Sequence, residues 1–450
     1  MNRSVAEALA ARVSSIEEKD IPEAVRKQCQ NLVVDIGGLC IAARNSDYIA
    51  ALKKSLDVGG ACTAIGHTET FSAEDAAMLN GTAAHGEDFD DTFEGGPVHS
   101  GAPVVPAVLA ACERFGRDGR SALLGIAAGV ETMCRLSLVA PKRIHDAGFH
   151  PTAVLGALAA AVSVSKTMNL NEKQTVHALG IAGSMAGGLG EYLVDGAWTK
   201  RLHPGWAAHC GLHAARLAKE GFTGPRTVLE GKRGVFAAFA RDSHFDFEKL
   251  NFKNEWLMTG LTFKPYATGT MNQPYIDCAL RLARRGFAAE DEAQVLCETA
   301  EGYVQRLWEP LAAKHRPPSA YAAKFSVPFN IAVAFVTGGA GFAAFSEKTV
   351  ADPRVLGLAA KVRYAVDPKN PYPHGYTGHV RMTLKDGRVF EERQPHIRGG
   401  ASEPLKKEEL ESKFRANAAH GGWPEALARE FLKYSEKAFD AKVDLAPFRA

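Results

Sequence analysis

Residues 153–164, which read Ala153-Val154-Leu155-Gly156-Ala157-Leu158-Ala159-Ala160-Ala161-Val162-Ser163-Val164, are apolar on almost every side when the stretch is drawn as a helix. A helix of this kind has no face for water, so it belongs in the middle of a large helical domain. The segments around it also carry apolar residues at helical spacing. They predict helices over residues 103–115, 120–139, 151–168, 172–193 and 204–220.

The pattern changes after about residue 260. Alternating and β-branched residues predict strands over 293–299, 361–366, 379–384 and from Val389, and Lys385-Asp386-Gly387-Arg388 is typical of a hairpin turn. Helices are expected over 275–285 and 324–337, and again in the tail over 405–410 and 423–439. The sequence therefore predicts a mostly α fold, with a large all-helical domain formed by both chain ends and an inserted, smaller α+β domain. The expected boundaries are 1–260 for the helical domain, 261–397 for the insertion and 398–450 for the returning C-terminal helices.

The composition argues against several classes of protein. A net charge of +2 over 450 residues gives no electrostatic case for binding nucleic acid or a membrane surface. The start, Met1-Asn2-Arg3-Ser4, has no signal-peptide core, and no uncharged apolar run approaches the roughly 20 residues that span a bilayer. The eight cysteines are scattered without a Cys-x-x-Cys pair, which is typical of reduced, buried thiols and argues against a zinc knuckle or an iron–sulfur site. These features predict a cytoplasmic protein with no nucleic-acid or membrane partner.

An acidic run, Asp88-Phe89-Asp90-Asp91-Thr92-Phe93, is followed closely by His99-Ser100-Gly101-Ala102-Pro103. Acidic clusters on a solvated surface are common and usually have no function. This cluster lies between segments that are expected to be core helices, so its carboxylates are expected to face a cleft. Burial and neighbouring like charges raise carboxylate pKa values, which is how acid–base groups arise in proteins.

Two further histidines are expected at helix starts. Pro151 suits the first helical position and places His150 at the N-terminus of the helix, where the helix dipole disfavours an imidazolium. A neutral imidazole can accept a proton, so His150 is a candidate general base, and the alternative is a capping histidine in a loop. Lys200 and His203 precede a helix expected to open at Pro204, which would form an anion site. The alternative there is a solvated basic turn.

Motifs for metals and organic cofactors are weak or missing. His209 and His213 have the i, i+4 spacing of metal ligands but lack a third ligand, so they are expected to be packed helix histidines. The glycine-rich stretches 182–190 and 338–341 do not connect a predicted strand to a helix, so the dinucleotide fingerprint is not met. Neither a Walker A sequence nor a Gly-x-Ser-x-Gly elbow is present.

Together these motifs resemble those of the MmgE/PrpD family. The resemblance is carried by the Asp-Phe-Asp-Asp-Thr run with its downstream histidine, by the Gly-Phe-His-Pro-Thr helix start and by the Thr-Lys-x-Leu-His-x-Gly pattern around Lys200. Three later motifs agree with it: Phe263-Lys264-Pro265-Tyr266, Ala323-Lys324-Phe325-Ser326-Val327-Pro328, and the tail from Pro404-Leu405 to Lys413-Phe414. Each motif is weak alone, but they follow one order over nearly the whole chain.

This family includes 2-methylcitrate dehydratase, cis-aconitate decarboxylase and iminodisuccinate epimerase, which act on small di- and tricarboxylates. The resemblance implies a helical domain from both chain ends, an inserted α+β lid domain, a homodimer, and catalysis without metal or organic cofactor. It also implies a site in a cleft between the two domains. The site residues expected from the motifs are Asp88, Thr92, His99, His150, Lys200 and Lys264, with Asp91 and His203 as further substrate-binding residues.

The sequence departs from the family pattern at three places. One extra residue separates Thr92 from His99 relative to the decarboxylase-like pattern. Val327 stands where those enzymes carry a tyrosine, and Gln273 replaces a histidine often found about nine residues beyond the Lys-Pro-Tyr motif. The reaction is therefore not transferred from any single member of the family.

The chemistry that the family shares is removal of a proton from carbon next to a carboxylate, or its reverse, and the charge that develops must be met by cations and hydrogen-bond donors. We expect these roles: carboxylate binding by Lys200 and Lys264, orientation by Thr92, base by His150, and acid by His99 held by Asp88 and Asp91. A dehydratase-type lyase is ranked first, an epimerase or racemase second and a cis-aconitate-type decarboxylase third. A non-catalytic carboxylate-binding protein ranks last, because binding alone needs no histidines beside carboxylates at helix termini.

Overall fold

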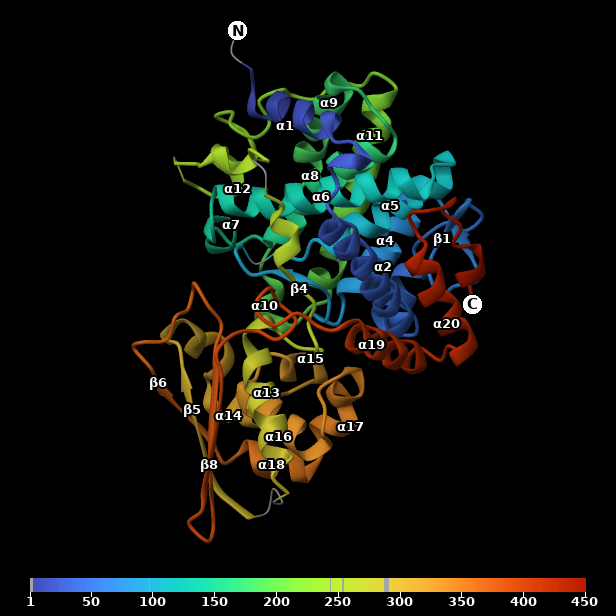
Figure 1. Ribbon diagram of the computed structural model, residues 1–450. Coiled ribbons are helices and arrows are strands. Elements are labelled where there is room, and N and C mark those ends of the chain that lie inside the picture. Colours follow the sequence, from blue (N-terminus) through green and yellow to red (C-terminus); the bar gives the residue numbers. More distant parts are fainter. Residues whose placement is uncertain (1–2, 97, 243, 253–254, 287–290) are drawn as a thin grey trace. The chain divides into compact units, whose positions relative to one another are not determined.

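The computed structural model describes residues 3–96, 98–242, 244–252, 255–286 and 291–450. The chain divides into two compact units, and both are drawn in Figure 1. The helical unit contains residues 1–86, 90–261 and 407–450. The mixed unit contains residues 87–89 and 262–406. Both chain ends thus contribute to the helical unit, and residues 398–406 belong to the mixed unit.

The helical unit is built mainly from α-helices, with three two-residue strands. Its helices are α1 (Val5–Ser15), α2 (Glu23–Ala43), α3 (Asp47–Lys54), α4 (Ala73–His85), α5 (Gly101–Phe115), α6 (Gly119–Val139), α7 (Arg143–Asp146), α8 (Pro151–Thr167), α9 (Glu172–Met185), α10 (Tyr192–Asp195), α11 (Thr199–Lys219), α12 (Val235–Phe239), α19 (Lys407–His420) and α20 (Glu425–Glu436). Its strands are β1 (Cys62–Thr63), β2 (Thr70–Phe71) and β3 (Thr92–Phe93). Short 3₁₀ turns lie at Glu18–Asp20, Phe247–Leu250, Leu257–Gly260 and Ala446–Phe448.

Helix α8 occupies the centre of this unit, as its composition predicts. Its residues from Thr152 to Val164 are all buried, and it packs against α5, α6, α9 and α11. The neighbouring α6 is the helix in the described part of the chain that is long and apolar enough to cross a membrane, but 89% of its most apolar window is buried inside the unit. Both helices therefore serve as core elements, because packing against other helices removes their apolar surface from water.

One predicted helix is interrupted. The expected helix over 172–193 ends at Met185, and a loop follows before α10 begins at Tyr192. The loop contains Gly187, Gly188 and Gly190, and Gly188 has φ +149°, a conformation that side chains disfavour. The glycines therefore end the helix, although the apolar pattern continues beyond them.

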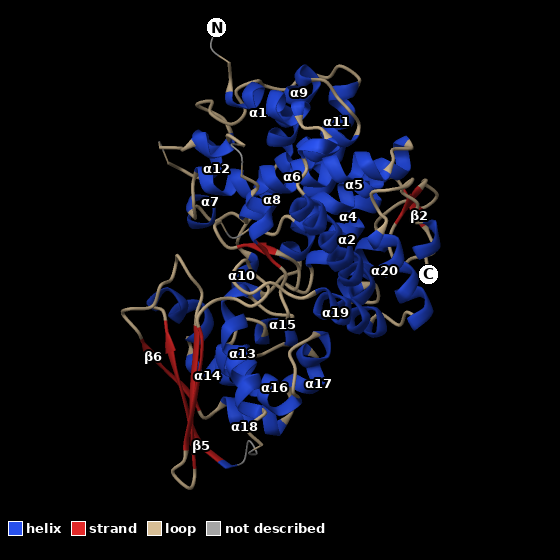
Figure 2. Cartoon of the chain, viewed as in Figure 1, coloured by secondary structure: helices blue, strands red, loops and turns tan. Residues whose placement is uncertain are grey.

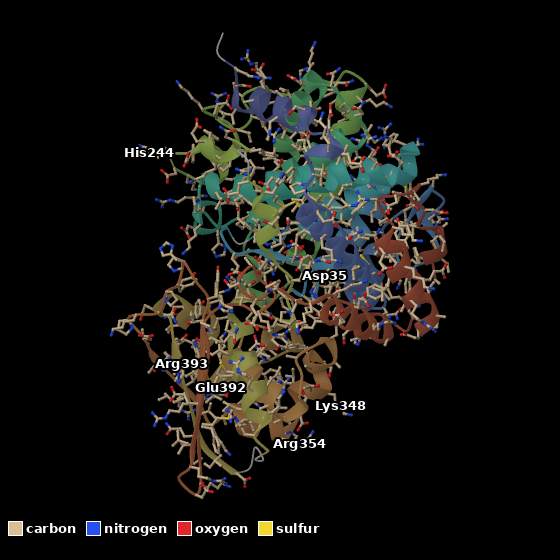
Figure 3. The ribbon with its side chains drawn as sticks, in the orientation of Figure 1. Asp35, His244, Lys348, Arg354, Glu392 and Arg393 are labelled. Atoms are coloured by element: carbon tan, nitrogen blue, oxygen red, sulfur yellow. The ribbon has the colours of Figure 1, made fainter. Side chains whose placement is uncertain are left out.

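The C-terminal segment joins the helical unit through apolar and ionic contacts. Helix α19 packs on α2 and α20, and the rings of Phe414 and Phe431 stack with centroids 5.2 Å apart. Lys413 Nζ lies 2.6 Å from Oδ1 of Asp35, and both side chains are buried. Asp35 is labelled in Figure 3. This buried ion pair links α2, near the start of the chain, to α19, near its end.

The mixed unit contains a four-stranded sheet with helices beside it (Figure 2). The sheet order is β6-β5-β7-β8, with β5 parallel to β6 and the other neighbours antiparallel. Its strands are β5 (Glu292–Thr299), β6 (Val362–Val366), β7 (Gly378–Leu384) and β8 (Val389–Gln394), while β4 (Leu261–Thr262) falls where the sequence passes from one unit to the other. Its helices are α13 (Gln273–Ala283), α14 (Leu311–His315), α15 (Ala320–Ala323), α16 (Val327–Thr337), α17 (Glu347–Val350) and α18 (Pro353–Ala359), with short turns at Thr270–Asn272, Glu301–Tyr303, Val304–Trp308 and Phe342–Phe345.

The burial of alternate apolar residues explains why these segments form a sheet beside a helix. On β7, Val380, Met382 and Leu384 are buried, and α13 packs against β7 and β8. The alternating residues that predict these strands therefore place their apolar face under a helix. The expectation that this unit acts as a lid stays a prediction.

All eight cysteines are buried and unpaired. Burial raises the pKa of the Cys62 and Cys210 thiols to about 12, so these thiols stay protonated and unreactive near neutral pH. This confirms the prediction of reduced, buried thiols.

Candidate functional site

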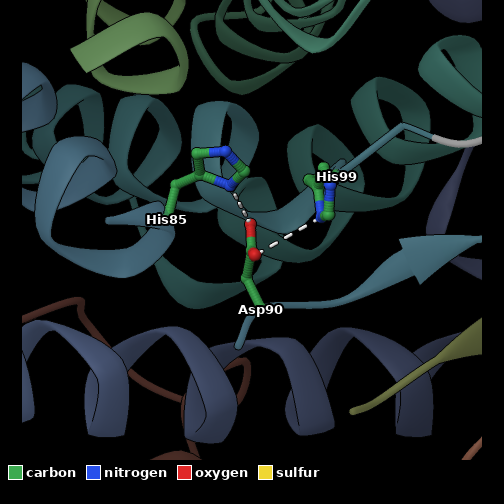
Figure 4. Close-up of side chains that lie close together, drawn as sticks. All are labelled: His85, Asp90 and His99. Carbon is green, nitrogen blue, oxygen red and sulfur yellow. Dashed lines mark hydrogen bonds and ion pairs between the residues drawn. The ribbon is translucent and has the colours of Figure 1, made fainter. Parts of the chain in front are cut away.

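Asp90 lies at the centre of a buried group of side chains in the helical unit (Figure 4). Nδ1 of His85, in the last turn of α4, lies 2.8 Å from Oδ2 of Asp90. Nδ1 of His99 lies 3.3 Å from the other carboxylate oxygen, and the two imidazole rings are 4.7 Å apart. Burial alone would raise the pKa of Asp90, but the two imidazoles more than offset this and hold the pKa below its ordinary range. One carboxylate therefore bridges two histidines.

Asp91 holds the start of α5. Its carboxylate accepts hydrogen bonds from the backbone N–H and hydroxyl of Ser100 and from the N–H of Gly101, at 2.9–3.1 Å. Its carbonyl oxygen lies 2.8 Å from Nδ1 of His99. Burial, with the like charge of Asp90 second, raises the pKa of Asp91 to about 6. Asp91 thus positions His99, through its backbone as well as through the helix start.

His150 is the N-cap residue of α8, with Pro151 as the first helical residue, as expected. Its Nδ1 lies 3.1 Å from Nδ1 of His203, so one ring donates and the other accepts. Burial is the main cause that holds the pKa of His150 well below its ordinary value, and the neighbouring His85 and Lys200 lower it further. The neutral imidazole expected from the helix dipole is therefore present, but chiefly for a different physical reason.

Lys200 and His203 both lie on α11, in its first turns. The prediction that this helix opens at Pro204 is wrong, because α11 begins at Thr199 and continues through Pro204. Both side chains are buried, so the alternative of a solvated basic turn is also wrong. Burial, with His85 and Lys200 next, lowers the pKa of His203 to about 4.

Two glycines allow α11 to pack closely against α4. A Cβ added to Gly81 would lie 2.8 Å from the Cα of Gly205, and one added to Gly205 would lie 2.2 Å from the carbonyl oxygen of Met78. Only glycine fits at such a crossing without displacing backbone. The close approach joins the helix that carries His85 to the helix that carries Lys200 and His203.

Thr92 lies on β3 and is buried. Its hydroxyl has no hydrogen-bond partner among the described residues. A buried hydroxyl without a partner is costly, so this group is suited to meet a polar ligand. The prediction that Thr92 orients a substrate carboxylate stays open.

Asp88 and Lys264 form an ion pair within the mixed unit. Asp88 adopts φ +55°, and Lys264 Nζ donates to its carbonyl oxygen at 2.9 Å and lies 2.6 Å from its carboxylate. In the structure Asp88 therefore pairs with Lys264, and the carboxylate beside His99 is that of Asp90. A substrate carboxylate on Lys264 would have to compete with Asp88.

Sequence reasoning missed His85 as a member of the site and gave Asp90 no role. His85 lies at the C-terminal end of an apolar helix, five residues before Asp90, and nothing in its local pattern distinguishes it from a packed helix histidine. The one available signal is its distance from the acidic run, which is short enough for a turn to bring the two together.

Two of the three departures from the family pattern, Gln273 and Val327, are buried in the mixed unit. Gln273 Nε2 donates to the carbonyl oxygens of Tyr266 and Thr268, each at 3.0 Å. Val327 is the first residue of α16 and is fully buried. The side-chain amide of Gln273 therefore donates to two backbone carbonyl groups at once from a single nitrogen.

His85, Asp90 and His99 are also the set of side chains, within the described ranges, with the spacing of a metal site. One possible ligand atom from each lies within 4.8 Å of the others. A metal ion on this set would compete with the hydrogen bond between His85 and Asp90. The expected absence of a metal stays a prediction.

The low pKa values near 4 of His85 and His203 predict an acid-sensitive fold. Both are neutral in the folded protein, whereas in the unfolded chain they take up protons below about 6.5. The free energy of unfolding should therefore fall as pH drops from about 6.5 to 4, by up to about 1.4 kcal/mol per pH unit for each histidine. Urea unfolding across this range should show a shallower slope for His203→Gln than for the wild type. If the free energy of unfolding changed with pH in the same way in both proteins, His203 would not be a cause of the acid sensitivity.

Known proteins match nearly the whole chain. Residues 7–248 match the MmgE/PrpD N-terminal domain, and residues 266–433 match the MmgE/PrpD C-terminal domain. Cis-aconitate decarboxylase of Mus musculus is 28% identical over 437 residues, which is 93% of this chain and 88% of the mouse protein. The Homo sapiens protein of the same name is 32% identical over 362 residues, or 76% of this chain and 72% of its own. That of Aspergillus terreus strain NIH 2624 is 28% identical over 437 residues, or 90% and 87%.

Proposed function

Because this chain belongs to the MmgE/PrpD family, we propose that it is a cofactor-independent lyase that forms a carbanion next to a carboxylate of a small di- or tricarboxylate. Decarboxylation of a cis-aconitate-like acid is the reaction placed first, and dehydration of a hydroxy acid is second. The motifs alone placed dehydration first. The order changes because the relatives named above are cis-aconitate decarboxylases and match most of the chain.

The observation that carries the proposal is the buried group of His85, Asp90, His99, His150 and Lys200 in one unit. It combines a fixed positive charge with imidazoles in two different settings. His99 faces the carboxylate of Asp90, with its Nδ1 3.3 Å from Oδ1, and this places its ring to serve as a proton donor. His150 is kept neutral by burial and by the cation. A donor and an acceptor of protons are therefore present in the same group.

In a decarboxylation, the bond between the carboxyl carbon and its neighbour breaks and CO₂ leaves. The electron pair stays on the neighbouring carbon and is delocalised into the unsaturated acid, and a new C–H bond forms when a donor supplies a proton. We assign Lys200 to the negative charge that develops and His99 to the proton, because the Nδ1 side of the His99 ring is held by Asp90 and by the carbonyl oxygen of Asp91. Thr92 remains the predicted ligand of a substrate carboxylate, and Lys264 a second one in competition with Asp88.

Dehydration is the second candidate because the site contains both an acid and a base. Loss of a hydroxyl needs a donor for the leaving oxygen and an acceptor for the proton on carbon. His99 and the neutral His150 supply these two roles. The same pair also suits an epimerase, which returns the proton to the other face of the carbon.

Proton NMR in D₂O distinguishes these reactions. The purified protein is incubated with cis-aconitate, citrate, 2-methylcitrate, malate and aspartate-derived dicarboxylates, and CO₂ release is measured in parallel. Two new vinyl signals with CO₂ from cis-aconitate support the decarboxylase, and vinyl signals from a hydroxy acid without CO₂ support the dehydratase. Deuterium at the α carbon with no new compound identifies an epimerase. If the folded protein changes the spectrum of none of these acids, the proposal that it acts on a small di- or tricarboxylate is wrong.

The activity found should survive removal of metal ions. Incubation with EDTA followed by desalting is expected to leave the turnover rate unchanged, since the proposed chemistry uses only protons and fixed charges. A loss of activity that added Zn²⁺ or Mg²⁺ restores would instead place an ion on His85, Asp90 and His99.

We also propose a homodimer located in the cytoplasm. The family resemblance is the support for the dimer, and the cysteine usage is the support for the location. Light scattering coupled to size-exclusion chromatography tests the dimer, and fractionation of the source cells tests the location.

A further inference from the structure

The contacts of the two imidazoles fix which nitrogen carries a hydrogen: Asp90 does so for His85, and the carbonyl oxygen of Asp91 does so for His99. A carboxylate only accepts hydrogen bonds, so Nδ1 of His85, at 2.8 Å, must be the donor. Nδ1 of His99 faces Asp90 at 3.3 Å and the carbonyl oxygen of Asp91 at 2.8 Å, and both of these are acceptors. Each neutral ring therefore carries its hydrogen on Nδ1 and a lone pair on Nε2.

The Nε2 atom of His85 has no role in the fold. It is buried and has no hydrogen-bond partner in the described part of the chain. The ring lies 4.7 Å from that of His99 and 5.6 Å from that of His150, so it stands between the two histidines assigned to catalysis. A buried acceptor without a partner at such a position is a group left available for a ligand.

From these contacts we propose that His85 is a further catalytic residue, which exchanges a proton with the substrate through Nε2, and that Asp90 is the positioning residue that it shares with His99. The proposal rests on the lyase function proposed above and extends it. In the decarboxylation, the neutral Nε2 of His85 takes the proton of the carboxyl group that leaves as CO₂, so an N–H bond forms as the O–H bond breaks. The electron pair of the broken C–C bond spreads over the allylic anion, and His99 gives its proton to the far end of that anion. Water then carries the proton from His85 back to His99.

The shared carboxylate makes the two rings complementary. The single negative charge of Asp90 can stabilise one imidazolium. If both rings were protonated, the two positive rings would lie 4.7 Å apart, and the positive charge of Lys200 would add to their repulsion. Burial is the main cause that lowers the pKa of His85; among the neighbouring groups Asp90 raises this pKa, and Lys200 and His99 lower it further. One ring of the pair can therefore act as acid while the other acts as base, which suits dehydration and epimerisation as well.

The first test replaces His85 by glutamine. We expect the turnover number to fall by about 10²–10⁴-fold with a much smaller change in KM, and one limb of the pH–rate profile to disappear. His67→Gln is the matched control, because His67 is also a buried histidine of the helical unit, with a pKa near 4. Wild-type turnover and an unchanged pH profile in His85→Gln would overturn the role of His85.

The second test replaces Asp90 by asparagine, which keeps the shape but presents an N–H₂ group to one of the two rings. We expect ¹⁵N NMR of the histidines to show Nδ1-protonated rings at His85 and His99 in the wild type and a changed tautomer in one of them in the variant. Glu113→Gln, which changes a carboxylate that is bonded to Thr63 and not to a histidine, is the control and should leave these signals unchanged. Nε2-protonated rings in the wild type would overturn the positioning role.

These readouts separate the two proposals. The NMR measurement needs no substrate, so it tests Asp90 even if the panel of acids gives no reaction. An active wild type with an unaffected His85→Gln variant leaves the lyase standing and removes only His85. If Asp90→Asn does not fold, the wild-type tautomers and the His85→Gln kinetics still decide the inference.

Discussion

Replacement of His150 by glutamine should lower the turnover number by about 10²–10⁴-fold, the range expected when a proton-transfer group is lost. Glutamine keeps a polar side chain at the start of α8 and can still bond to His203, but it cannot take up a proton. The neutral state of His150, caused by burial and by the nearby His85 and Lys200, is what suits it to be a base. Steady-state kinetics with the substrate found by NMR measure the effect.

Which kinetic parameter changes in His150→Gln, the turnover number or KM, matters as much as the size of the loss of activity. A residue that acts on the proton in the transition state should change the turnover number with little effect on KM. His67→Gln again serves as the control for loss of a buried imidazole. Near-normal turnover in His150→Gln would remove this residue from the mechanism and leave the pair around Asp90 to supply both acid and base.

Replacement of Lys413 by methionine should lower the free energy of unfolding by about 3–5 kcal/mol. Lys413 lies 2.6 Å from Asp35, and both side chains are buried in the helical unit. Removing the cation leaves a buried carboxylate without its opposite charge, which costs far more than the pair itself contributes. Urea unfolding of the two proteins gives the difference.

The double variant Asp35→Leu with Lys413→Met identifies the cause. Replacing both partners by apolar groups removes the uncompensated charge, so most of the lost stability should return. Lys433→Met, at an exposed position on α20, is the control for losing a lysine from the same part of the chain. If Lys413→Met is no more harmful than Lys433→Met, the ion pair does not hold the C-terminal helices to α2.

Much of the fold could be predicted because helical and strand patterns are local. The apolar stretch around Ala159 is the core helix that it predicts, and the strands from residue 292 onward were found from alternation and a turn. The break after Met185 and the start of α11 at Thr199 were missed. At the first place glycines end the helix, and at the second the helix continues through a proline. Which of the two happens depends on the surrounding packing, and a local sequence pattern does not contain that information.

The candidate site could be predicted only in part. The motifs identified His99, His150 and Lys200, and the structure places these side chains in one buried group. They did not identify His85, whose role depends on a carboxylate brought to it by the turn after α4. The closely spaced Asp88 and Asp90 were not distinguished either, although their side chains go to different partners.

The sequence by itself determined the helical core, the order of helices and strands, the family, and most of the residue types in the site, because periodicity and motifs are properties of neighbouring residues. Only the tertiary structure decided which carboxylate meets which cation or imidazole and which groups are protonated. Those outcomes depend on short distances between separate segments and on burial, as in the contacts of Asp90 at 2.8 and 3.3 Å and in the neutral His150. Charge and protonation change with distance and exclusion of water, and neither is present in the sequence until the chain has packed.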